Sequence, residues 1–253
     1  FHDVRRPELI EHKVVTLVSQ RVYGIALGYE DLNDHDELRR DPLMAVLAGK
    51  LAARREECAP VAGKSTLNRL ELSRLEPTRY HKISHNPIAI KRLLVDPFLE
   101  AHERAPSEII LDLDATDDPV HGDQEGRFFH GYYDCYCYLP LYIFCGRDLL
   151  AANLRSASMD AAAGAVEEVA RIVAHIRRHW PKVRILLRAD SGFARDELMA
   201  WCEANGVHFL FGLAQNDRLN IEIASELARA EARSRRTGKP VRYFKDFRWQ
   251  TRR

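Results

Sequence analysis

Residues 109–116 read Ile-Ile-Leu-Asp-Leu-Asp-Ala-Thr, and residues 183–190 read Val-Arg-Ile-Leu-Leu-Arg-Ala-Asp. Each run is largely apolar, has the length of a buried strand and carries an acidic residue near its end. A carboxylate at the end of a buried strand is costly to desolvate unless it is paired or binds a metal. If the two strands lie side by side, Asp114 and Asp190 could share divalent cations, as in enzymes that hold two metal ions roughly 3.5–4 Å apart.

The composition is that of a folded protein with a substantial core. The chain has 253 residues, of which 46% are hydrophobic and 30% are charged, which argues against disorder. This length fits one large domain, or one domain with a smaller helical part. The net charge is only +1, so overall charge does not indicate a polyanionic partner, although the residues from Arg229 onward are dense in Arg and Lys.

Targeting and redox signals favour a reduced, cytoplasmic protein without a membrane partner. No apolar run reaches the roughly 18 residues that a membrane span requires. The first residues do not have the pattern of a signal peptide. The five cysteines are odd in number, and Cys135 and Cys137 do not have the spacing of a zinc site.

Residues 1–104 are predicted to be helical. Apolar spacing indicates helices over residues 8–24, 42–51 and 66–75, and a helix and turn over residues 90–99. Pro42 suits the first turn of the second helix. Ser65 is predicted to be the N-cap of the third.

From Pro106 onward the pattern changes to strands and helices. Strands are predicted over residues 109–116, 132–145, 149–155, 183–190 and 207–213, and helices over residues 161–178 and 194–205. This α/β order, β-β-β-α-β-α-β, is that of the ribonuclease H-like mixed sheet. In that order the ends of the first and fourth strands are neighbours, so Asp114 and Asp190, which are 76 positions apart (190 − 114), are expected to lie close together. A helix over residues 218–236 and a strand-like stretch over residues 241–251 follow.

Three segments around these aspartates carry a family resemblance. They read Leu-Asp-Leu-Asp-Ala-Thr-Asp-Asp-Pro (residues 111–119), His-Gly-x-Gln-Glu-Gly (residues 121–126) and Arg-Ala-Asp-Ser-Gly-Phe (residues 188–193). Together with residues 26–36 and 63–69, they resemble DDE transposases of bacterial insertion sequences, in particular the insertion-sequence family numbered 1380. The resemblance covers almost the whole chain.

The resemblance implies a cut-and-paste DNA transposase. Residues 1–104 would be a helical N-terminal region, residues 105–216 a ribonuclease H-like catalytic core, and residues 217–253 the start of an inserted subdomain. Asp114 and Asp190 match the first two catalytic acids of the family. The third acid, a Glu in a Tyr-x-x-Arg-x-x-x-Glu motif, is not found, so we expect a truncated chain that lacks its catalytic Glu and is inactive alone.

The cofactor and partners also follow from the resemblance. Asp114 and Asp190 would bind Mg²⁺ (or Mn²⁺), which prefers hard oxygen ligands. Water, and then the freed 3′-hydroxyl, would attack a phosphodiester of double-stranded DNA, at the terminal inverted repeats and at the target. A homodimer is expected in the DNA complex. No nucleotide is expected, because Cys58 stands where a phosphate-binding loop ending at Gly63-Lys64-Ser65 would need glycine.

Polar and basic side chains are expected to contact the DNA. They are Lys64, Arg69, His121, Gln124, Arg127, His130, Arg236, Lys239 and Arg242. The last three belong to a basic run that continues to Arg252 and Arg253 and has aromatic residues interleaved. The alternative for each is an ordinary solvated side chain.

Other residues leave the assignment of the site open. Asp112 lies on the same strand face as Asp114, so it could be the ligand instead, or it could pair with a base. Arg188 could form a salt bridge to an acid on that face rather than contact DNA. Asp117 and Asp118 are more simply explained as caps of the loop that follows the strand.

Glu222 and Glu226 offer another way to complete the acidic trio. They lie on the predicted helix after the fifth strand, where simpler ribonuclease H-like enzymes carry the last carboxylate. Two alternative functions therefore remain at this point. One is a non-catalytic DNA-binding remnant, and the other is a ribonuclease H-like nuclease that uses Glu222 or Glu226.

Overall fold

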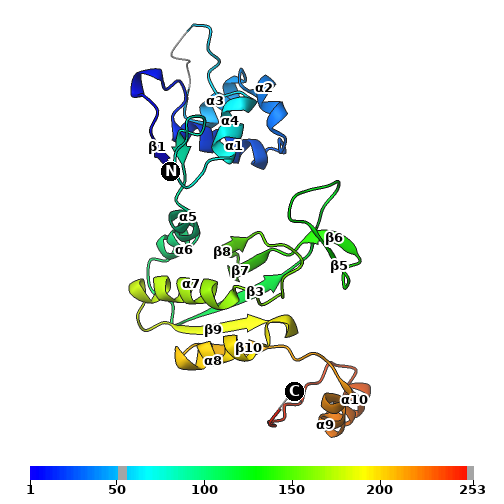
Figure 1. The fold of residues 1–253 in the computed structure, drawn as a ribbon. Coiled ribbons are helices and arrows are strands. Elements are labelled where there is room, and N and C mark those ends of the chain that lie inside the picture. The colour runs from blue at the N-terminus through cyan, green and yellow to red at the C-terminus, as the bar shows by residue number, and fades with distance from the viewer. Residues whose placement is uncertain (51–55, 250–253) are drawn as a thin grey trace. The chain divides into compact units, whose positions relative to one another are not determined.

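The computed structural model describes residues 1–50 and 56–249 (Figure 1). The chain divides into two compact units, residues 1–93 and residues 94–253. The domain boundaries predicted near residues 104 and 216 stay predictions. Among the described residues, no helix combines the length and the apolar character needed to cross a membrane.

The first unit consists mainly of short helices. They are α1 (Val14–Ala26), α2 (His35–Leu38), α3 (Pro42–Leu47), α4 (Lys64–Glu71) and α5 (Pro87–Leu93), with 3₁₀ turns at Pro7–Leu9 and Leu32–Asp34. Strand β1 (His2–Asp3) pairs antiparallel with β2 (Ile83–Ser84). Leu17 of α1 and Leu67 of α4 are fully buried. The buried Gln20 amide donates to the Ala62 carbonyl and accepts from the Ala62 amide, which ties α1 to the segment that precedes α4.

Helix boundaries in this unit differ in part from those predicted. Helix α4 begins at Lys64 with Gly63 as its N-cap, so the prediction that Ser65 is the N-cap was wrong. Helix α1 begins at Val14 rather than at residue 8, because residues 7–9 form a 3₁₀ turn. Helix α3 starts as predicted, with the Asp41 carboxylate accepting from the Leu43 amide at 2.7 Å. It ends at Leu47, and residue 51 lies outside the described residues.

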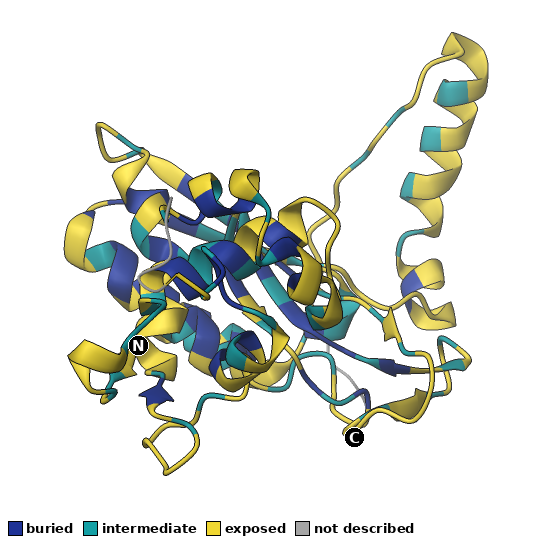
Figure 2. Cartoon of the chain, turned by 90° about the horizontal axis from the view of Figure 1, so that it is seen from above, coloured by how far each residue is buried: buried dark blue, intermediate teal, exposed yellow. Residues whose placement is uncertain are grey.

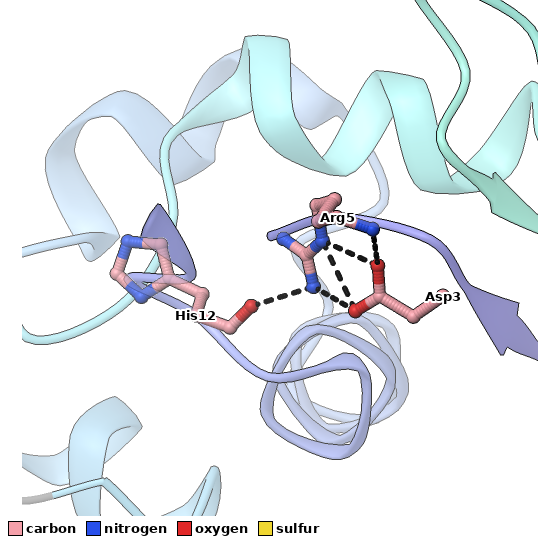
Figure 3. A network of polar contacts seen from close by, with 3 residues as sticks. All are labelled: Asp3, Arg5 and His12. Atoms are coloured by element: carbon pink, nitrogen blue, oxygen red, sulfur yellow. Dashed lines mark hydrogen bonds and ion pairs between the residues drawn. The ribbon is translucent and has the colours of Figure 1, made fainter. Parts of the chain in front are cut away.

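A polar network fixes the chain around β1 (Figure 3). The Arg5 guanidinium donates to both carboxylate oxygens of Asp3, at 2.8 Å and 2.7 Å, and to the His12 carbonyl at 3.0 Å. Its hydrogen bonds hold the pKa of the Asp3 carboxyl below the usual value. The Arg5 charge is therefore largely compensated within the unit.

The second unit is built on a five-stranded mixed sheet, in the order β10-β9-β3-β7-β8. The strands are β3 (Glu108–Ala115), β7 (Leu141–Cys145), β8 (Asp148–Asn153), β9 (Arg184–Ala189) and β10 (His208–Phe211). Strands β3, β7 and β8 run antiparallel, whereas β9 is parallel to β3 and to β10. In chain order this is the ribonuclease H-like arrangement, so the predicted fold class is confirmed.

The hydrophobic core lies on one face of this sheet, because buried residues alternate with half-buried or exposed ones along β3 and β9. Figure 2 colours the chain by burial. Leu111 of β3 and Leu187 of β9 are fully buried there, and they belong to one cluster with α6 (Val95–Glu100), α7 (Ala165–His179) and α8 (Asp196–Ala204). Side chains alternate along a strand, so Asp112 and Asp114 point to the opposite face. Residues on that face are half-buried or exposed.

A small second sheet interrupts the predicted second strand. Residues 132–145 do not form one strand: β6 (Cys135–Tyr138) pairs with β4 (Asp118–Pro119) and β5 (Phe128–His130), and only β7 joins the main sheet. The break falls at Pro140, which has no N–H to donate to a ladder. The predicted loop 117–128 is therefore part of a β-ribbon, residues 118–138, which lies between β3 and β7 in the chain.

The helices that follow are shorter than predicted. Helix α7 begins at Ala165 rather than at residue 161, because Gly164 before it has a left-handed φ of 74°. The predicted helix 218–236 is split into α9 (Asp217–Glu222) and α10 (Ala224–Thr237). Residues 241–249 form no strand, contrary to the prediction for 241–251, and the rest of that stretch lies outside the described residues.

Candidate active site

The parallel pairing of β3 with β9 aligns the two predicted acids. The register pairs Glu108 with Arg184 and Asp112 with Arg188, an offset of 76 (188 − 112). The same offset relates Asp114, which lies in β3, to Asp190, which is the first residue after the end of β9. Both side chains are exposed. The topology thus places Asp114 and Asp190 at the same end of the sheet, on adjacent segments of the chain.

Local structure around Asp190 orients its carboxylate. Asp190 caps the 3₁₀ turn Ser191–Phe193, and its Oδ1 accepts from the Gly192 amide at 2.8 Å. The buried Phe193 anchors this turn in the core. Among the described residues, no cationic side chain lies within ion-pair distance of Asp114 or Asp190.

Asp112 has a different environment. Its carboxylate accepts two hydrogen bonds from Arg188, at 2.5 Å from Nε and 2.9 Å from Nη2. This bidentate pair spans β3 and β9 on the face that carries Asp114, and it raises the pKa of Arg188. Asp112 is thus compensated by a protein cation. The arrangement agrees with the interpretation that it pairs with a base rather than binding metal.

Tyr133, which the sequence did not single out, lies near the acids. It follows β5 on the β-ribbon and packs against the same buried cluster of Cys137, Leu139 and Ala157 as Ala115, the residue after Asp114. Burial raises the pKa of the Tyr133 hydroxyl, and the negative charges of Asp117, Asp114 and Asp190 raise it further. The phenol therefore lies within electrostatic reach of both predicted catalytic acids. Tyr133 lies near these acids because of the way the ribbon folds, and the aromatic composition of this stretch does not predict that fold.

Gly212 was also missed, and it lies against the backbone of Asp190. Its amide donates to the Ala189 carbonyl at 3.1 Å, just past the end of β10. A Cβ at this position would lie 3.0 Å from the Ser191 nitrogen and 3.3 Å from the Asp190 carbonyl carbon. A side chain here would therefore require the backbone of Asp190 and Ser191 to shift by a few tenths of an ångström.

Replacing Gly212 by Ala is expected to lower metal-dependent DNA cleavage by about 10- to 100-fold, because displacing a ligand by a fraction of an ångström is costly. The Mg²⁺ concentration needed for half-maximal cleavage should rise. Gly131→Ala is the matched control, because nothing lies within 4 Å of its added Cβ. Wild-type cleavage and Mg²⁺ dependence in Gly212→Ala would show that this close approach does not position Asp190.

The polar residues predicted on the ribbon lie near one another. Arg127 donates to Asp123 at 2.8 Å and stacks over the Tyr136 ring at 4.4 Å. The His130 ring lies 4.8 Å from the Tyr133 ring, and its buried Nδ1 has no hydrogen-bond partner among the described residues. The exposed side chain of Gln124 reaches only the His121 carbonyl, at 3.4 Å. Contact of these four residues with DNA stays a prediction.

The other predicted DNA contacts lie apart from the acids in the sequence. Lys64 pairs with Asp36 at 3.2 Å, whereas Arg69 donates to the Thr66 hydroxyl. Arg236, Lys239 and Arg242 are exposed, at and after the end of α10. Arg252 and Arg253 lie outside the described residues.

Glu222 and Glu226, the acids that could complete a trio, form ion pairs with a lysine. Glu222 and Glu226 lie 3.0 Å and 3.8 Å from the Lys245 ammonium. Within residues 1–50 and 56–249, no three His, Cys, Asp or Glu side chains form a group that could hold a metal ion. Of the candidate acids, Asp114 and Asp190 combine adjacent positions, exposure and hard oxygen donors without a compensating cation.

Comparison with known proteins gives one match that covers the whole chain. A family model described as "Transposase DDE domain group 1" matches residues 1–253. No curated protein matches the sequence.

Similar solved structures include the catalytic domain of Mos1 mariner transposase, with 9% identity and a TM-score of 0.33 over 67% of this chain and 79% of that chain. The Mos1 transposase paired-end complex with the left transposon end has 10% identity and a TM-score of 0.29, over 82% of this chain and 62% of that chain. The Drosophila P element transposase strand transfer complex has 9% identity and a TM-score of 0.28, over 75% of this chain. The chain spans 40% of that last protein's length.

Proposed function

The chain belongs to the family described as Transposase DDE domain group 1, and on this premise we propose that Asp114 and Asp190 supply two of the three acids for metal-dependent cleavage and strand transfer of DNA, and that the chain is inactive without the third acid, a Glu. The observation that carries this proposal is the parallel β3–β9 register, which brings two uncompensated carboxylates to one end of the sheet. Three short segments that include these acids, residues 111–119, 121–126 and 188–193, support assignment to the insertion-sequence family numbered 1380.

The residues present fit a hard divalent cation such as Mg²⁺ or Mn²⁺. Carboxylate oxygens are the ligands such ions prefer, and Mg²⁺ keeps several waters, so two protein carboxylates are an acceptable partial set. When bound, the metal ions supply activation of the attacking oxygen and stabilisation of the leaving oxygen. The exposure of both acids leaves room for phosphate oxygens and water in the remaining positions.

Different side chains would bind the metal ions, position the acids and contact the scissile phosphate. Asp114 and Asp190 hold the metal ions, and the Gly192 amide fixes the Asp190 carboxylate. The Asp112–Arg188 pair braces β3 against β9 beside them. A tyrosine hydroxyl is protonated at neutral pH, and burial and the nearby acids raise the pKa of Tyr133 further, so its hydroxyl can donate a hydrogen bond to a phosphate oxygen.

The substrate and partners that we infer are double-stranded DNA carrying the terminal inverted repeats, the target DNA, and a second copy of the protein in the DNA complex. A cytoplasmic location suits this substrate in a bacterium. Pairing of Glu222 and Glu226 with Lys245 disfavours the alternative nuclease, in which one of these glutamates would join the metal site.

Cleavage of a duplex that carries the element end tests the function. Protein that carries all three acids is expected to nick this duplex with Mg²⁺ or Mn²⁺, to lose this activity when EDTA removes the metal, and to recover it when Mg²⁺ is added back. Residues 1–253 alone are expected to bind the duplex without nicking it. Asp190→Ala should abolish cleavage but retain DNA binding, because backbone phosphate contacts do not require the metal site. Binding without cleavage by protein that carries all three acids would instead favour the non-catalytic remnant.

A further inference from the structure

The first unit contains a cavity of about 280 Å³ whose lining is strongly basic. Three separate pieces of the unit form it: the segment after β1, helix α4, and the turn that leads into β2. Its polar lining residues are Arg5, Thr66, Arg69, Arg79, Tyr80 and Lys82. We refer to it as the basic cavity.

The charges of the basic cavity are largely uncompensated. Four of its lining residues are cationic and none is acidic. Arg5 is neutralised by Asp3 (Figure 3). In the part of the chain that the structure describes, Arg69, Arg79 and Lys82 have no carboxylate partner. Three positive charges around one hollow repel each other, and an anion bound between them would offset this repulsion.

The positions of these side chains are set by hydrogen bonds of the backbone. The Thr78 hydroxyl accepts from the Tyr80 and His81 amides, and the Thr78 amide donates to the His81 carbonyl at 2.7 Å, which closes the turn that carries Arg79. The Lys82 carbonyl accepts from the Val4 amide at 3.0 Å, next to the β1–β2 pairing. The backbone that carries Arg79 and Lys82 is therefore ordered before any ligand arrives.

The chemistry of the lining suits phosphate groups. Arg presents a planar fork of donors that matches phosphate oxygens, and Lys adds a point charge. Hydroxyls of Thr and Tyr are common donors to DNA phosphates. Thr66 and the exposed Tyr80 provide such hydroxyls, and the Arg79 guanidinium lies 5.8 Å from the Tyr80 ring.

We propose that the basic cavity binds backbone phosphates of duplex DNA, an inference that rests on the proposed function. Its cations come from a helix, a strand end and a turn, so they are spread over several chain segments. This spread suits consecutive phosphates of a polymer better than a single free ion. The cavity adds Arg79 and Lys82 to the DNA contacts predicted from the sequence.

The test compares DNA binding by two double variants of the full chain. Arg79→Ala/Lys82→Ala removes two free charges from the cavity, whereas Arg40→Ala/Arg92→Ala removes two exposed charges elsewhere in the same unit. Circular dichroism and thermal unfolding check that both variants fold. Affinity for a mixed-sequence duplex is measured by fluorescence anisotropy over a range of salt concentrations.

The cavity variant is expected to bind the duplex roughly 10-fold more weakly. The slope of log K against log salt should shrink by about 1.8, because each of the two phosphates that the variant no longer neutralises contributes about 0.9. The control variant should keep the wild-type slope. Equal slopes in the cavity variant and the wild-type protein would overturn the proposal.

Two further outcomes separate this inference from the function on which it rests. Calorimetric titration with inorganic phosphate shows whether the cavity is a free-anion site: phosphate binding that disappears in the cavity variant, with duplex binding unchanged, overturns the proposal but leaves the transposase function intact. Failure of the wild-type protein to bind any duplex overturns both. Loss of duplex binding in the cavity variant alone supports the proposal, even if cleavage is never observed.

Discussion

Asp114→Asn is expected to lower Mg²⁺-dependent DNA cleavage by about 1,000-fold or more. Metal ions supply several kcal/mol of charge stabilisation in the transition state, and each 1.36 kcal/mol corresponds to a factor of about ten in rate. Asparagine keeps the size of the side chain but removes the negative charge, so the fold should be unchanged. The rate is measured as single-turnover nicking of an end-containing duplex by protein that carries all three acids.

Asp112→Asn is the matched control for this substitution. Asp112 is two residues away on the same strand face, but its carboxylate is held by Arg188. Exposed ion pairs contribute only about 0–1 kcal/mol to stability, so this variant should fold and keep cleavage within roughly ten-fold of the wild type. The opposite pattern, with Asp112→Asn inactive and Asp114→Asn active, would transfer the metal site to Asp112.

Arg155→Met is expected to lower the free energy of unfolding of the second unit by about 2–4 kcal/mol, as loss of a buried hydrogen-bonded group does. The Arg155 guanidinium is buried, with 9% of the residue exposed. It donates to the carbonyls of Leu139 at 2.9 Å, Ala161 at 3.2 Å and Ala163 at 2.5 Å. Methionine fills a similar volume but leaves these three acceptors without their donor.

The Arg155→Met substitution removes hydrogen bonds between three segments of the second unit. Arg155 joins the end of β8 to the β6–β7 junction at Leu139 and to the turn before α7. Unfolding is followed by tryptophan fluorescence during urea titration, because Trp180, Trp201 and Trp249 all belong to the second unit. Arg147→Met, at an exposed hairpin turn, should change stability by less than about 0.5 kcal/mol. Equal effects of both substitutions would contradict this role for Arg155.

The order of the main sheet was predictable because its signals are local. The apolar runs 109–116 and 183–190 are too regular to be loops, and helices with clear apolar stripes separate the later strands. The parallel pairing of β3 with β9 then follows from the chain order. That register makes Asp114 and Asp190 candidates for one site before any distance is known.

The rest depends on contacts between residues far apart in the chain. Composition alone favours a strand throughout 132–145, but Pro140 and the pairing of β6 with β5 divide it between two sheets. The bonds of Arg155 to carbonyls on two other segments, and the approach of Gly212 to Asp190, leave no pattern in the local sequence. Tyr133 was missed for the same reason, since only the ribbon brings it near the acids.

A crystal structure of the protein with Mn²⁺, located by its anomalous scattering, tests the central proposal most directly. The account predicts an ion bound at about 2 Å by carboxylate oxygens of both Asp114 and Asp190, and absence of that ion from Asp114→Asn crystals. A manganese ion held by other residues, or the two carboxylates lying more than about 10 Å apart, would contradict it.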